Sequence, residues 1–241
     1  MHFFQKYTED GFEIIELNND LISARIIVNI GNTLFSLKQN EIEKMYFPFS
    51  FDEYKTNTKL AGNPFMHPWS NRLEADFILV DGEQSYFPTE KKSLIYRDGN
   101  QLPLHGLLLK TDKWETIDLY EDANVCWHLA ELNFVYADWL SIFPFKHKIQ
   151  IKHQLKDNEL TIETIIINED EKLMPVHFGF HPYFLKTDEV IKLTIPDTKL
   201  CFISNDSNRT KHESSRILKF QPRERLKCLL EPKIRDDSCF P

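Results

Sequence analysis

The chain has 241 residues, of which 41% are hydrophobic and 27% are charged, so we expect a soluble globular protein and assign residues 1–241 to a single domain. The formal net charge is −8, from 37 acidic against 29 basic residues. This balance offers no general positive field for nucleic acid or anionic lipid, so neither is an expected partner.

The chain carries no sequence signal for a membrane or for a metal. Its first residues lack the basic region and apolar run of a signal peptide, and no apolar stretch reaches membrane-spanning length, so we expect a cytoplasmic location. The four cysteines have no pair at metal-ligand spacing, which argues against a zinc site and a disulfide framework: Cys126, Cys201, Cys228 and Cys239.

The first third of the chain predicts three short strands and then a long loop. Residues 12–17, 21–28 and 33–37 are β-branched, apolar runs separated by turn residues. Residues 47–71 contain Pro48, Gly62, Pro64 and Pro68 and show no periodicity, so we expect a loop there. The end of this segment is too aromatic for disorder.

The rest of the chain also predicts strands. Asp81-Gly82 lies between residues 77–80 and 84–87 and indicates a hairpin. Further strands are expected at 114–119, 125–132, 145–155, 160–167, 190–195, 200–204 and 226–230, with a polar loop at 205–215. Because helical periodicity is nearly absent, the predicted fold class is all-β and mostly antiparallel.

Four short segments carry candidate functional side chains. His181 lies in the aromatic run of residues 177–184 and precedes Pro182, which limits its backbone freedom. His105 sits among apolar residues beside a glycine, Arg72 follows Asn71 at the end of the long loop, and Glu231 precedes a proline. Taken singly, each histidine is more often a hydrogen-bonded core group than an acid or base.

Together these segments resemble the aldose 1-epimerase (galactose mutarotase) family over roughly residues 10–200. The resemblance rests on residues 62–64 and 68–72, on the hairpin with Gly82 and Tyr86, and on residues 104–107 and 179–184. Four motifs in the same order are more specific than any one of them. The resemblance implies an antiparallel β-supersandwich with a sugar-binding groove on one sheet.

The resemblance also implies residue roles. It assigns His181 as the general acid and Asn71, Arg72 and His105 as sugar contacts. The base in this family is a glutamate near the C-terminus, and Glu231 stands in a similar context, one residue further from its cysteine than usual. The interval from His181 to Glu231 is shorter than in the family, which leaves open a fold shortened at the C-terminus. In that case Asp236-Asp237 would match an upstream acidic pair, and the base would be missing.

Opening a cyclic hemiacetal needs this set of side chains. A base removes the anomeric hydroxyl proton while an acid protonates the ring oxygen, and the aldehyde rotates before the ring closes on its other face. Neither a metal nor an organic cofactor is required. An arginine offers a planar donor fork to hydroxyl groups, and an aromatic ring such as Trp69, Phe178 or Tyr183 can stack on the sugar.

Alternative interpretations remain open at this stage. Lys59 or Arg97 near Arg72 would favour a hexose 6-phosphate as substrate, and a chain without its base would be a non-catalytic sugar-binding module. Arg72 itself has a simpler reading as a surface ion pair with Glu74 or Asp76. The partner is expected to be a small-molecule sugar, and the protein a monomer or a homodimer. Three more histidines are interpreted as structural: His67, His147 and His153.

Overall fold

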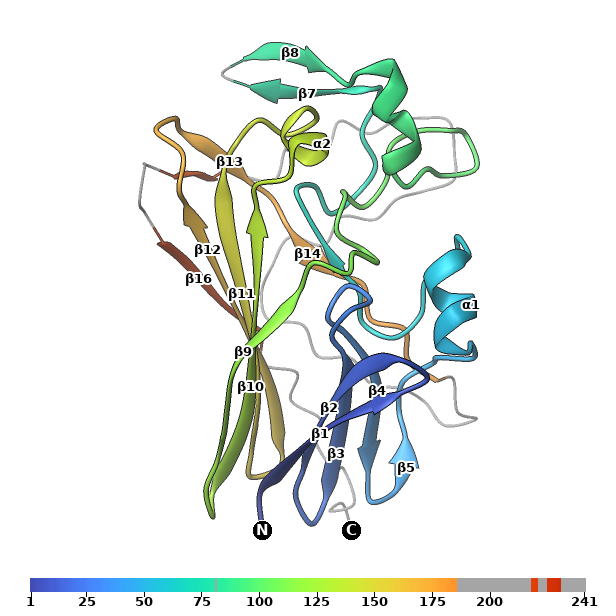
Figure 1. Cartoon of the computed structure of the whole chain (residues 1–241), viewed down its shortest axis with the longest axis vertical. Coiled ribbons are helices and arrows are strands. Elements are labelled where there is room, and N and C mark those ends of the chain that lie inside the picture. The colour runs from blue at the N-terminus through green and yellow to red at the C-terminus, as the bar shows by residue number, and fades with distance from the viewer. Residues whose placement is uncertain (81, 186–217, 221–224, 231–241) are drawn as a thin grey trace, which may run out of the picture.

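Two antiparallel sheets form the body of the molecule (Figure 1). The computed structural model describes residues 1–80, 82–185, 218–220 and 225–230. Each of the two main sheets has five strands, and three further strand pairs lie outside them. Among the described residues, no helix is long and apolar enough to cross a membrane.

The first sheet is a meander in which each strand pairs with the next one along the chain. Its register is antiparallel throughout, with a bulge between Arg25 and Ile26. The three strands predicted for this region are confirmed, and the structure adds a strand on each side. The five strands are β1 (Phe3–Glu9), β2 (Phe12–Asn18), β3 (Ile22–Ile27), β4 (Thr33–Gln39) and β5 (Ile42–Glu43).

The second sheet has the order β16-β12-β11-β10-β9, also antiparallel. The alternation predicted for residues 145–155 is confirmed, because every second residue of β11 from His147 to Leu155 is buried. The strands are β9 (Glu115–Glu121), β10 (Val125–Phe134), β11 (His147–Lys156), β12 (Glu159–Asn168) and β16 (Arg225–Leu230).

One hydrophobic core joins the two sheets. Leu17 and Ile26 from the first sheet and Leu132 and Ile151 from the second belong to the same cluster of fully buried side chains. Since alternate residues of a strand face opposite sides, the other face of the first sheet needs its own cover. A second cluster around Phe35 and helix α1 provides that cover.

Residues 47–71 are more ordered than predicted. Helix α1 (Phe51–Thr56) lies within them, and so does the short strand β6 (Phe65–Met66). Ser50 caps the helix by accepting from the Glu53 N–H, and Glu53 reciprocally accepts from the Ser50 N–H. This capping box is visible in the sequence, but six residues are too few to show helical periodicity. The expected loop is therefore corrected to a capped helix followed by a strand.

Shorter elements complete the fold. The predicted hairpin is confirmed as β7 (Phe77–Val80) and β8 (Glu83–Tyr86), and a 3₁₀ helix, η1 (Thr89–Leu94), and helix α2 (Ala137–Leu140) were not predicted. β13 (Met174–Val176) pairs with β15 (Leu218–Phe220), and β14 (Gly179–Phe180) pairs with β6. The elements predicted at residues 190–195, 200–204 and 205–215 lie outside the described residues.

Three histidines interpreted as structural are fully buried. His67 and His147 face each other with their Nε2 atoms 2.8 Å apart, and the Nδ1 of His147 donates to the carbonyl oxygen of Phe145 at 2.8 Å. His153 stacks on His128, with ring centroids 6.1 Å apart. Burial lowers the pKa of His147 and of His153 to about 4, so both rings are neutral at physiological pH and pack as core side chains.

Candidate functional site

The pairing of β6 with β14 carries His181 to its position. Gly179 lies opposite Met66, and the same ladder continues as the His181 N–H donates to the Pro64 carbonyl at 3.1 Å and the Tyr183 N–H donates to the Gly62 carbonyl at 2.8 Å. A side chain at Gly179 would meet the Ser70 side chain at 3.0 Å. A glycine at 179 therefore lets the two segments approach closely.

A left-handed backbone conformation at residues 105 and 106 places His105 beside the segment that continues from β6 to Asn71. His105 and Gly106 have φ values of 62° and 76°. A Cβ atom at Gly106 would lie 2.1 Å from the His67 carbonyl oxygen, so only glycine fits against the His67 backbone. The His105 N–H donates to the Asn71 carbonyl at 3.3 Å, which joins this turn to the Asn71-Arg72 segment.

The two predicted histidines meet edge to face. The ring centroids of His105 and His181 lie 5.3 Å apart at an interplanar angle of 73°. Tyr183 stacks on His181 at 4.7 Å, and Tyr96 lies over His105 at 6.2 Å. All four rings are half-buried, so each keeps part of its surface exposed while the rest is packed.

Hydrogen bonding determines which nitrogen of His105 is available. Its Nδ1 lies 3.1 Å from the Ser70 carbonyl oxygen, which is an acceptor only, so Nδ1 carries the proton of the neutral ring and Nε2 is left for a ligand. Burial is the main cause that lowers the pKa of His105, and the charges of His181 and Arg72 lower it further against the opposing hydrogen bond to Ser70. The neutral form of this ring is thereby favoured.

Arg72 lies next to His105 because its backbone forms an antiparallel bridge with Leu104. Its Nε pairs with Asp98, whose carboxylate also accepts the N–H groups of Asn100 and Leu102 at 2.9 Å each. Those backbone bonds and the guanidinium lower the pKa of Asp98. Asp98 thus holds the exposed Arg72 side chain at the cluster.

This ion pair differs from the pairs considered from sequence. Asp76 is paired with Lys92 and Arg97, each at 2.7 Å, and the partner found for Arg72 is Asp98. Asp98 stands 26 residues away from Arg72 in the sequence, inside a turn, and no motif marks it. The contact arises from the ladder between residues 72 and 104 and from the 98–102 turn.

Ser70 and His177 are further residues that the sequence reasoning did not assign to the site. The Ser70 N–H donates to the Nδ1 of His177 at 3.1 Å, while the carbonyl oxygen of the same serine accepts a hydrogen bond from the Nδ1 of His105. His177 is the first residue of the aromatic run at residues 177–184, but nothing in the sequence indicates what its ring contacts. Its ring supports the loop that holds His105.

The aromatic residues expected to stack on a sugar divide into two groups. Trp69 is only 3% exposed and stacks on Phe87 at 5.5 Å, so the expectation that it stacks on a ligand is wrong. Phe178 packs against Phe65 in the main core. Tyr183 is half-buried beside His181 and remains the ring that a ligand can reach.

The structure brings together most of the predicted site residues. Asn71, Arg72, His105 and His181 come from three separate segments and are linked by the contacts above. Glu231, the predicted base, lies outside the described residues. Among the residues that are described, no three His, Cys, Asp or Glu side chains are grouped as metal ligands.

Solved structures share this arrangement of strands. A galactose mutarotase-like protein from Clostridium acetobutylicum matches at 18% identity and a TM-score of 0.67, covering 76% of this chain and 54% of that one. Galactose 1-epimerase from Lactobacillus acidophilus matches at 20% identity and a TM-score of 0.58, covering 76% and 53%. The fold is therefore galactose mutarotase-like, as predicted, and the chain spans about half the length of these proteins.

The family follows from the sequence match. The family model described as aldose 1-epimerase matches residues 13–225. The chain belongs to the aldose 1-epimerase family, and the resemblance found in its motifs is confirmed.

A first prediction concerns the backbone at His105. We expect Gly106→Ala to lower the free energy of unfolding by about 2 kcal/mol or more, because the new Cβ would overlap the His67 carbonyl and the left-handed φ would be strained. Urea denaturation measures this change. The matched control is Gly99→Ala, since a Cβ there meets no atom within 4 Å, and its effect should stay within about 0.5 kcal/mol. Equal effects of the two substitutions would contradict the proposed close approach.

A second prediction concerns the electrostatics of the cluster. Removing the cation in Arg72→Gln stabilises the imidazolium form of His105, so the pKa of His105 should rise toward its ordinary value. Titration of the histidine side chains by ¹⁵N NMR measures the pKa and also reports the Nδ1-protonated tautomer. Arg97→Gln is the control, because the Arg97 charge is paired with Asp76. If Arg72→Gln leaves the pKa of His105 unchanged, the Arg72 charge does not act on the His105 ring.

Proposed function

We propose that the protein is an aldose 1-epimerase that interconverts the α and β anomers of an aldohexose without a cofactor. The observation that carries this proposal is the edge-to-face contact of His105 and His181 next to Arg72. Family membership supports the same reaction class. Three polar groups from distant segments, open to solvent on one side, fit a polyhydroxylated substrate of small size.

In the proposed reaction, His181 acts as the general acid. It donates a proton to the ring oxygen as the bond between that oxygen and the anomeric carbon breaks, while Glu231 accepts the proton of the anomeric hydroxyl. The open-chain aldehyde then rotates about the bond to its neighbouring carbon. Closure on the other face reverses both proton transfers, so the acid and the base are restored.

The neighbours of His181 hold the substrate during these transfers. The unprotonated Nε2 of His105 accepts a hydrogen bond from a sugar hydroxyl, which its lowered pKa favours. Arg72 donates to hydroxyl oxygens or to the ring oxygen as charge develops there. Asn71 directly precedes Arg72 in the chain. Tyr183 supports the His181 ring by stacking.

A phosphorylated hexose is the second candidate substrate, because a basic residue, Lys59, comes directly after a residue that contacts the cluster. The Tyr96 hydroxyl donates to the Thr58 carbonyl at 2.5 Å, and Tyr96 also lies over His105. Lys59 therefore follows a residue that is tied to the site. Arg97, the other basic residue considered, is occupied by Asp76 and by the Gln101 carbonyl.

The main prediction is that the chain accelerates mutarotation and that His181→Ala removes the acceleration. General acid catalysis contributes about 100-fold or more, so the variant rate should approach the uncatalysed rate. Polarimetry of freshly dissolved α-glucose and α-galactose measures this. His2→Ala is the control, since His2 contacts the Ala123 carbonyl near the N-terminus. Full activity of His181→Ala would overturn the assignment.

The same assay separates the enzyme from a non-catalytic relative. Glu231→Gln should abolish the acceleration if Glu231 is the base, while sugar binding followed by NMR persists. Binding without any rate enhancement in the wild-type chain would instead identify a sugar-binding module that lacks its base.

A further prediction tests the phosphorylated substrate. If a 6-phosphate contacts Lys59, Lys59→Gln should raise the KM for glucose 6-phosphate about 10-fold, the loss expected for one charge-assisted hydrogen bond, and leave the KM for glucose unchanged. Lys55→Gln is the matched control, because Lys55 lies on helix α1 with its ammonium over the Phe12 ring of β2. An equal change in the KM for both substrates would argue against a contact between Lys59 and the phosphate.

A further inference from the structure

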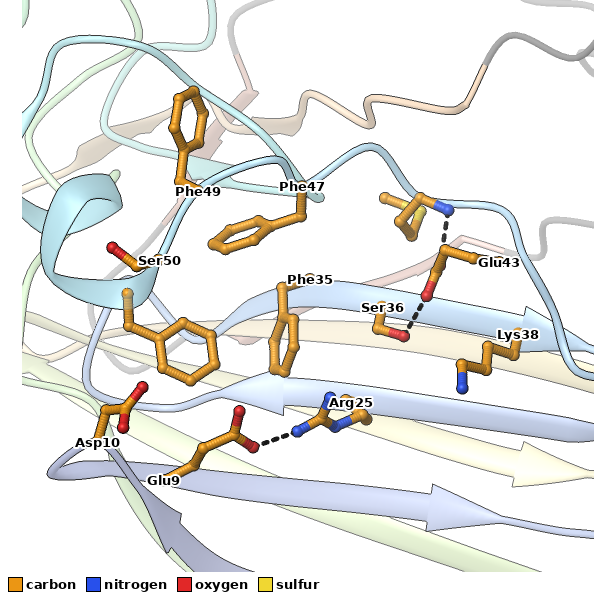
Figure 2. Close-up of a pocket in the computed structure, with 12 residues that line it drawn as sticks. Glu9, Asp10, Arg25, Phe35, Ser36, Lys38, Glu43, Phe47, Phe49 and Ser50 are labelled. Carbon is orange, nitrogen blue, oxygen red and sulfur yellow. Dashed lines mark hydrogen bonds and ion pairs between the residues drawn. The ribbon is translucent and has the colours of Figure 1, made fainter.

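A hollow lies on the other face of the first sheet, outside the cluster of His105 and His181 (Figure 2). Its volume is about 300 Å³. The hollow lies between strands β3 and β4, the segment after β5 and the start of helix α1. The residues that line it are Glu9, Asp10, Arg25, Phe35, Ser36, Lys38, Glu43, Met45, Phe47, Phe49, Ser50 and Phe51.

Aromatic rings form one wall of this hollow. The ring centroid of Phe35 lies 5.5 Å from that of Phe47 and 5.1 Å from that of Phe51, and the centroids of Phe47 and Phe49 lie 6.3 Å apart. Phe35 and Phe51 are buried, whereas Phe47 and Phe49 are half-buried at the mouth. The inner rings belong to the second hydrophobic cluster, which fixes their positions, and the outer rings keep part of their surface accessible to a ligand.

Part of the polar wall is already committed to the fold. The Glu43 carboxylate accepts the backbone N–H groups of Leu37 at 2.9 Å and Met45 at 2.8 Å, and it also accepts the Ser36 hydroxyl. Glu43 therefore fixes the shape of the wall and has little capacity for a ligand. Figure 2 shows Glu43 turned toward Ser36 and away from the rings.

The remaining charged groups are of both signs. Arg25 lies over the Phe35 ring at 4.8 Å and pairs with Glu9 through one terminal nitrogen. Within the described part of the chain, Lys38 forms one ion pair, a 3.9 Å contact with the exposed Glu41. Asp10 stands at the opposite end of the hollow from Lys38 in Figure 2.

This combination of groups selects a class of ligand. An anion would meet the carboxylates of Glu9, Asp10 and Glu43, and a cation would meet Arg25 and Lys38. A neutral polyol suits both the acidic and the basic side chains, because its hydroxyl groups donate hydrogen bonds to carboxylates and accept them from the cations. An aromatic wall favours a ligand with an apolar face, which a pyranose ring presents through its C–H groups.

We propose that this hollow, lined by Phe35, Phe47, Asp10, Arg25 and Lys38, is a second binding pocket for a neutral monosaccharide. It is separate from the proposed catalytic cluster, and its occupation does not depend on the catalytic function. The two sites share one segment: Met45 lines the hollow, and the N–H of the next residue, Tyr46, donates to the Tyr183 carbonyl at 2.8 Å.

Methionine methyl NMR distinguishes the two sites in the intact chain. The chain has four methionines, Met1, Met45, Met66 and Met174. Met45 lines the hollow, and Met66 pairs with Gly179 beside His181. Titration with glucose and with galactose should shift the Met45 signal saturably, with a midpoint in the millimolar range that differs from the midpoint of Met66. Met45→Leu and Met66→Leu variants assign the signals.

Variants at the pocket make the test specific. Asp10→Asn and Lys38→Gln should each raise the Met45 midpoint about 10-fold, the loss expected for one charge-assisted hydrogen bond, and leave the Met66 midpoint and the mutarotation rate unchanged. Glu41→Gln is the control, since Glu41 is exposed beside Lys38 and does not line the hollow. It should change neither midpoint.

Three results would overturn the proposal. The first is a Met45 signal that neither sugar moves. The second is a Met45 shift with the same midpoint as Met66 and no response to Asp10→Asn or Lys38→Gln, which would mean that the signal only reports the catalytic cluster through Tyr46. The third is saturation by inorganic phosphate or by choline in place of the sugars, which would assign a charged ligand. None of these results bears on the mutarotation rate, so the proposed function is tested independently.

Discussion

The backbone pairing between residues 62–66 and 179–183 is the constraint on which the rest of the site depends. Two ladder pairs and two further hydrogen bonds join segments more than a hundred residues apart. The pairing sets His181 against His105, and a glycine at 179 allows the close approach because a Cβ atom there would lie 3.0 Å from the Ser70 side chain. Closing so long a loop costs conformational entropy that the buried core has to offset, so the geometry of the site depends on the core.

Backbone carbonyls and supporting side chains then orient the cluster. The Ser70 carbonyl accepts a hydrogen bond from His105, and the Ser70 N–H donates one to His177. Asp98 forms an ion pair with Arg72. Each of these bonds ties a polar side chain of the cluster to a loop that the core supports. A substrate would therefore meet groups that are already placed, which lowers the entropic cost of binding.

The first sheet carries different chemistry on its two faces. One face packs against the second sheet through a cluster of buried apolar side chains, and the other is covered by aromatic rings next to a charged hollow. A strand alternates its side chains between faces, so one short meander serves both purposes. The segment from Glu43 to Phe47 passes from the hollow to Tyr183 and links the two regions through its backbone.

The fold class, the family and most strands follow from the amino-acid sequence, because period-two alternation and four ordered motifs are local properties of the chain. The buried alternation of β11 and the hairpin at Gly82 are examples. The motifs also marked Arg72, His105 and His181. Three contacts are set by tertiary packing: Asp98 pairs with Arg72, Trp69 is buried against Phe87, and Ser70 sets the tautomer of His105. These contacts join residues distant in sequence or use backbone atoms that every residue possesses, so no pattern of side chains announces them.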